Sequence, residues 1–111
     1  MEATSAVTCR FFLQGGWTVD RAGEQRSYLL DELSRVMESE PRPARAEIDL
    51  SQVGEVDACG CQLLAVFLQE LARRGIGAVA CEVPRRVADK IEQLGFGGAL
   101  CADRSSTRGR P

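Results

Sequence analysis

The sequence contains no histidine and few aromatic side chains, since Phe, Trp and Tyr make up only 5% of its residues. The lack of histidine removes the commonest general base and a frequent metal ligand. Basic residues are not in excess either, because the formal net charge is -2. A general nucleic-acid binder needs a strong basic excess to displace counterions from phosphates, so the composition argues against that class.

Long apolar runs are also missing from the sequence. No stretch approaches the roughly 20 apolar residues that a membrane-spanning helix requires. The N-terminal segment MEATSAV lacks the basic flank and apolar centre of a signal peptide. The five cysteines form no Cys-x-x-Cys pair, which indicates reduced thiols rather than a disulfide framework. We therefore expect a cytoplasmic protein with no metal site and no direct membrane insertion.

The strongest pattern in the sequence lies in its centre, over residues 46–75. Ala46, Ile48 and Leu50 alternate with polar residues, which is the two-residue period of a strand. Further along, apolar residues recur at i, i+3, i+4 and i+7, the spacing of one helical face. These residues are Leu64, Phe67, Leu68 and Leu71. The pattern predicts a strand that passes into a long amphipathic helix.

Two residues mark the ends of this predicted helix. Asp57 precedes the first turn, where a carboxylate can accept hydrogen bonds from backbone N–H groups that the turn leaves unpaired. Gly75 follows the last turn, directly after two arginines that suit the negative end of the helix dipole. The chain should therefore turn sharply at Asp57 and again at Gly75.

The flanking segments predict further strands and helices. Two alternating segments on either side of Gly15-Gly16 are typical of a β-hairpin. Residues 22–38 have an apolar helical stripe, and the prolines that follow end this helix. Residues 76–83 are small and apolar, as in a buried parallel strand, and a last helix should run from Pro84 to Gly95. Residues 96–102 predict a short strand or a loop.

These elements follow the order β-β-α-β-α-β-α, which indicates an α/β domain with a small mixed sheet. A chain of 111 residues suits one domain. We expect a lead at residues 1–5, the folded domain at residues 6–102, and a disordered polar tail at residues 103–111.

The central region resembles the STAS domains of bacterial anti-sigma factor antagonists. The resemblance rests on the order of Asp49-Leu50-Ser51, Val56-Asp57, Gly60 and a leucine-rich helix ending in Arg73-Arg74-Gly75. It implies a small sheet with helices packed on one side, and a non-catalytic protein that binds a partner protein. In those antagonists the residue after the aspartate is a serine that a partner kinase phosphorylates. Here that position is Ala58, which has no hydroxyl, so the switch cannot be carried over.

The resemblance places the partner-binding surface at the corner that opens the central helix. We expect this surface to include Val56, Asp57, Ala58, Cys59, Gly60 and Gln62. The implied partner is an anti-sigma factor of the serine-kinase type. The alternative is a scaffold subunit bound to the ATPase of a phospholipid-transporting ABC system, or a chemotaxis-associated complex. We expect no enzymatic activity, no cofactor and no nucleic-acid partner.

Several residues in and near this surface have both a functional and a purely structural interpretation. Asp57 can be an ordinary N-cap, and Gly60 can be required only for packing. A thiol at Cys59 would see the positive end of the helix dipole and could act as a redox sensor, although cysteine often replaces a small core residue. Arg85, Arg86 and Lys90 could meet an acidic partner, or form a solvated face.

Overall fold

A computed structural model describes residues 7–100 of the chain. Strands and helices alternate along it, as expected for an α/β domain. In chain order the elements are β1 (Thr8–Trp17), the 3-10 helix η1 (Val19–Arg21), α1 (Ala22–Met37), β2 (Arg45–Val56), α2 (Ala58–Arg73), β3 (Gly77–Cys81) and α3 (Arg85–Gln93). The predicted α/β class is therefore confirmed, and α1, α2 and β3 lie close to their predicted positions.

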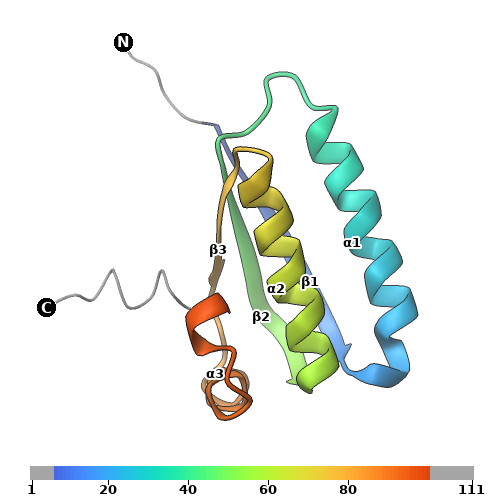
Figure 1. The fold of residues 1–111 in the computed structure, drawn as a ribbon, viewed down its shortest axis with the longest axis vertical. Helices are drawn as coiled ribbons and strands as arrows, with labels where there is room; N and C mark the ends of the chain where they lie inside the picture. Colours follow the sequence, from blue (N-terminus) through green and yellow to red (C-terminus); the bar gives the residue numbers. More distant parts are fainter. Residues whose placement is uncertain (1–6, 101–111) are drawn as a thin grey trace, which may run out of the picture.

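The sheet has the strand order β1-β2-β3, and both neighbouring pairs are parallel. Parallel neighbours cannot be joined by a tight turn, so each pair needs a crossover connection. Helix α1 connects β1 to β2, and α2 connects β2 to β3. The two helices lie side by side over the same face of the sheet (Figure 1), as the resemblance implied.

The predicted hairpin at Gly15-Gly16 is wrong. Strand β1 continues through both glycines and pairs with β2 as far as Trp17, which lies opposite Val56. Its register against β2 shifts twice near Gly15, whose φ is 82°. Only glycine adopts this conformation readily, so the pair forms a bulge within a strand instead of a turn. Without the hairpin, the three strands that the structure describes are all parallel, and the predicted mixed sheet is wrong as well.

Two smaller predictions also differ from the structure. We expected a loop over residues 53–57 to form part of the docking surface, but β2 extends to Val56, so residues 53–56 are strand. Residues 97–100 are helical, although a strand or loop was predicted there. The expected lead at residues 1–5 and polar tail at residues 103–111 lie outside the described residues.

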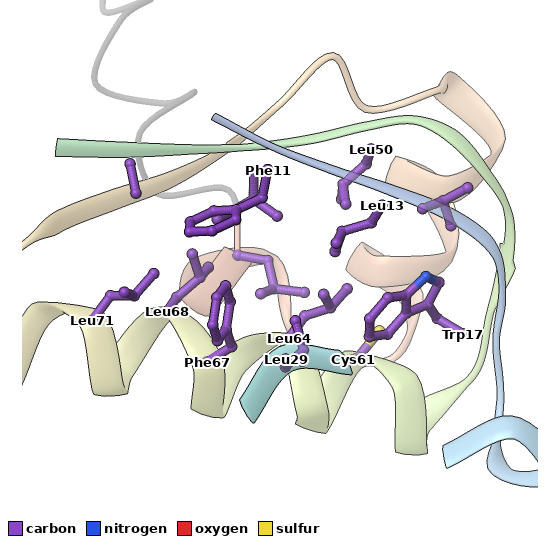
Figure 2. Close-up of a cluster of buried hydrophobic side chains, with 14 of the residues drawn as sticks. Phe11, Leu13, Trp17, Leu29, Leu50, Cys61, Leu64, Phe67, Leu68 and Leu71 are labelled. Carbon is purple, nitrogen blue, oxygen red and sulfur yellow. The ribbon is translucent and has the colours of Figure 1, made fainter. Parts of the chain in front are cut away.

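The hydrophobic core lies between the sheet and the helices (Figure 2). Phe11 of β1 meets Phe67 of α2 edge to face, with ring centroids 5.5 Å apart, an arrangement that adds to the gain from area burial. α3 contributes Val87 and Ile91 to the same cluster. Each fully buried aliphatic side chain stabilises the fold by about 1.5–3 kcal/mol. The core therefore fixes α2 against β1, which sets the position of the corner before α2.

Helix α2 ends as its sequence predicts. Gly75 has a φ of 86°, the left-handed conformation that ends many helices. The N–H of Ile76 then donates to the carbonyl of Leu71 at 2.9 Å, which satisfies a carbonyl of the last turn. The chain can therefore reverse directly into β3.

Candidate functional site

The corner between β2 and α2 is built around Asp57. One carboxylate oxygen, Oδ1, accepts a hydrogen bond from the Gly60 N–H at 3.0 Å, which confirms the predicted N-cap. The other, Oδ2, accepts from the Val19 N–H at 2.9 Å, and the Asp57 N–H donates to the Trp17 carbonyl at 3.2 Å. Asp57 thus connects the start of α2 to the end of β1 and to η1. No local sequence pattern indicates the second connection, which spans 38 residues.

The electrostatics of Asp57 follow from these bonds. Hydrogen bonds from backbone N–H groups hold the pKa of its carboxyl below the usual range. The N–H of Gly60 has the largest effect, and the N–H of Val19 has the next largest. The carboxylate is therefore charged at neutral pH, next to the positive end of the α2 dipole. Because both oxygens already accept hydrogen bonds, the side chain acts as a structural clamp.

Gly60 is fixed by a close contact with β1. A β-carbon at this position would lie 1.7 Å from the Trp17 carbonyl oxygen and 2.6 Å from the Trp17 carbonyl carbon. Neither distance is sterically allowed, so only glycine lets the first turn of α2 approach the strand this closely. The packing interpretation of Gly60 is therefore confirmed.

The predicted site residues divide into an outward group, an inward group and the half-buried Asp57. Ala58 and Gln62 are exposed, and Cys59 is half-buried. Val56 is only 5% exposed and Gly60 is buried, so these two support the corner from below. We call the outward group, Ala58, Cys59 and Gln62, the corner surface.

The two cysteines of the first turn lie on different sides of α2. Cys61 is fully buried and points into the core (Figure 2), whereas Cys59 lies at the corner surface. None of the four described cysteines forms a disulfide. Cys59 and Cys61 are therefore not joined to each other.

A hollow of about 460 Å³ lies beside the corner, between the end of β2 and α3. It is lined by Gly54, Glu55, Val56, Arg86, Val87 and Lys90. Arg86 and Lys90 are one helical turn apart, and within residues 7–100 neither is in an ion pair. The basic face predicted for the last helix thus lies against the end of β2, where the acidic Glu55 lines the same hollow. Sequence reasoning identified these cations but could not place them there.

The Asp49-Leu50-Ser51 motif has a structural role. Asp49 is 5% exposed, and its carboxylate accepts hydrogen bonds from the Ser51 N–H at 2.8 Å and from Arg10 at 2.8 Å. Hydrogen bonds hold the pKa of Asp49 below the usual range, and those from Ser51 have a larger effect than the one from Arg10. Arg10 also pairs with Glu47. The motif therefore joins β1 to β2 away from the corner.

Two further observations concern residues 7–100 as a whole. They include no group of three or more His, Cys, Asp or Glu side chains placed to hold a metal ion. They also include no helix with the length and apolar character that crossing a membrane demands.

The family model described as "STAS domain" matches residues 19–103. The chain belongs to the STAS domain family. No curated protein sequence matches this STAS domain significantly.

Solved structures share the fold of this STAS domain. The STAS domain of a SulP transporter from Vibrio cholerae is 17% identical, with a TM-score of 0.66, over 97% of this chain and 89% of that one. The unphosphorylated anti-sigma factor antagonist SpoIIAA is 15% identical, with a TM-score of 0.58, over 99% of this chain and 96% of that one.

A third structure contains the fold as a small part of a large protein. The murine anion transporter Slc26a9 is 17% identical, with a TM-score of 0.73, over 91% of this STAS domain. The domain spans only 16% of that transporter. At these identities the similarity concerns the fold alone.

Proposed function

We propose that this STAS domain is a non-catalytic module that binds a partner protein through the corner surface. The observation that carries the proposal is the exposure of Ala58 on a corner whose shape is fixed. Asp57 ties this corner to Val19, and Gly60 packs against Trp17. A rigid exposed corner is suited to recognition by shape, because little ordering is needed when the partner arrives.

The chemistry of the corner favours binding over catalysis. Its carboxylate, Asp57, already uses both oxygens as hydrogen-bond acceptors. The sequence has no histidine to serve as a general base. The outward side chains Ala58 and Gln62 are neutral and have no acid–base function. Arg86 and Lys90, in the hollow at the end of β2, outnumber Glu55 there and would attract a partner with an acidic surface.

The proposed partner is an anti-sigma factor of the serine-kinase type, in the cytoplasm. In antagonists that this chain resembles, phosphorylation of the serine after the aspartate adds charge and breaks the complex. Ala58 takes that position here and has no hydroxyl. The complex would therefore respond to the concentrations of the two proteins and not to phosphorylation.

The first test is a charge placed at the position of the missing phosphate. Ala58→Glu should weaken partner binding at least about tenfold, because it places a charge in the centre of the proposed contact. The fold should tolerate it, since residue 58 is exposed and acidic residues are favourable at helix N-termini. Ala72→Glu is the matched control, an exposed alanine near the other end of α2. Equal binding by all three proteins would contradict the proposed corner contact.

An alternative partner is the ATPase of a phospholipid-transporting ABC system, or a chemotaxis-associated complex, with the STAS domain as a scaffold subunit. The lack of a hydroxyl at Ala58 favours this alternative, because a scaffold needs no phosphorylation switch. Purified anti-sigma kinase and purified ABC ATPase from the source organism should be compared by calorimetry. Saturable binding of only the ATPase, weakened by Ala58→Glu, would replace the first partner with the second.

A further inference from the structure

A second surface of the domain is an apolar groove between α1 and α2, which we call the α1/α2 groove. Its volume is about 300 Å³. Its floor is formed by Leu29 and Phe67, and its walls by Leu30, Leu33, Leu63 and Val66. The groove lies on the helical side of the domain, along α1 and α2, and begins about one helical turn beyond Cys59 and Gln62 of the corner surface.

The walls of the α1/α2 groove are unusually accessible for such large apolar side chains. Leu30 of α1 is 47% exposed and Val66 of α2 is 48% exposed. Single exposed leucines are common on protein surfaces, but here the two residues line one concave surface. Covering that surface would remove apolar area from water without any change in the fold.

Both ends of the groove are positively charged. Arg26 lies at one end, and within residues 7–100 it has no ion pair. At the other end Glu70 accepts hydrogen bonds from both Arg73 and Arg74. Arg74 and Glu70 line the groove and Arg73 lies just outside its lining, so this end and its immediate surroundings carry two positive charges and one negative charge. The groove therefore complements a ligand that is apolar in the middle and acidic at its ends.

The length of the groove matches a short helix. α1 and α2 run in the same direction (Figure 1), so Arg26, near the start of α1, and Arg74, after the end of α2, lie at opposite ends. From Leu63 to Arg74 the rise of an α-helix gives about 16 Å. Three helical turns cover this distance, and their apolar residues at i, i+3, i+4 and i+7 form one stripe.

We propose that the α1/α2 groove binds an amphipathic helix of a partner protein, about three turns long, with an acidic residue at each end of its apolar stripe. This is the helix-in-groove mode of recognition. A second copy of the chain complements the groove less well. In a two-fold dimer the same surface would face itself and bring cationic ends together.

A designed peptide tests the groove directly. The probe is a fluorescein-labelled amphipathic peptide of about four turns, with leucines at i, i+3, i+4 and i+7 and a glutamate on either side of them. Fluorescence anisotropy with the full chain should show saturable binding. The same peptide with lysines in place of the glutamates should bind at least about fivefold more weakly, because it places like charges at both ends.

Two variants locate the binding on the protein. Leu30→Asp should weaken binding of the acidic peptide at least about tenfold, since it removes one apolar wall. Arg26→Glu should weaken it about fivefold and should strengthen binding of the lysine peptide. Phe12→Asp and Arg45→Glu are the matched controls, at exposed positions on the sheet. Circular dichroism should show that each variant is folded. If Leu30→Asp does not fold, Arg26→Glu still tests the groove.

The outcomes separate this proposal from the corner surface. Ala58→Glu should bind the acidic peptide like the wild type, so loss of partner binding at the corner leaves the groove intact. Absence of saturable binding would overturn the groove proposal, as would equal binding of the acidic and lysine peptides. A dimer in sedimentation experiments that Leu30→Asp converts to a monomer would also overturn it, because the occupant would then be a second copy.

Discussion

A β-carbon on Gly60 would lie 1.7 Å from the carbonyl oxygen of Trp17. The first turn of α2 therefore rests on the backbone at the end of β1, with no side chain between them. Asp57 strengthens the same contact, since its N–H donates to the Trp17 carbonyl at 3.2 Å. The shape of the corner surface depends on this approach of helix to strand, and the first prediction concerns it.

Gly60→Ala should destabilise the domain strongly. The added methyl group cannot be accommodated unless α2 moves away from β1, which we expect to cost about 3 kcal/mol or more. Urea unfolding followed by circular dichroism measures this loss. Gly54→Ala is the matched control, because a β-carbon there meets no atom within 4 Å, and it should change stability by less than about 1 kcal/mol. Similar values for the two variants would contradict the close contact.

Asp57→Asn should lower stability at neutral pH. The amide oxygen of asparagine can still accept from the Gly60 N–H, but its NH2 group cannot accept from the Val19 N–H. The link between α2 and η1 is then lost while the cap is retained. The unfolding midpoint in urea should fall at pH 7. Asp31→Asn, at an exposed position of α1, removes a similar charge and should leave the midpoint nearly unchanged.

Asp57→Asn should also reduce the dependence of the free energy of unfolding on pH in the acidic range. The folded-state pKa of Asp57 is lowered, so its contribution is complete above its unfolded pKa of about 3.9. That contribution disappears as the pH falls through the lower, folded value. Wild type should therefore lose more stability than Asp57→Asn between about pH 5 and pH 2. Parallel profiles over this range would show that the carboxylate is not stabilised by the fold.

Gln25→Ala should weaken the bulge in β1. Gln25 of α1 is 9% exposed, and its amide donates to the Gly16 carbonyl at 2.8 Å. Removing the donor leaves this carbonyl without that hydrogen bond, which should cost about 1–3 kcal/mol. Ser27→Ala, at an exposed position on the same helix, is the control and should change stability by less than about 0.5 kcal/mol. An unchanged unfolding midpoint for Gln25→Ala would show that the bulge needs no support from α1.

Local sequence patterns predicted the elements around the corner well. Alternation before Val56 and helical spacing after Asp57 differ sharply, and each pattern reflects burial on one face. The N-cap at Asp57 and the left-handed Gly75 depend on interactions within a few residues. Such features can be found from sequence because the residues that cause them are neighbours in the chain.

The prediction of a hairpin was wrong because the local sequence pattern is compatible with two backbone structures. A glycine pair between alternating segments can form a turn, or a bulge in one continuous strand. The choice at Gly15 depended on β2, which pairs with β1 on both sides of the bulge. The contact between Asp57 and Val19, and the meeting of α1 with α2 at Leu30 and Val66, also come from distant segments. No local pattern contains that information.

The clamp at Asp57 also affects how partners could be distinguished. A corner tied to both β1 and η1 has fewer ways to remodel itself around different molecules, which disfavours induced fit. In the proposed corner contact, selectivity would then come from the side chains at residues 58, 59 and 62. Exchanging those few side chains between members of the family should transfer partner choice while the backbone beneath stays the same.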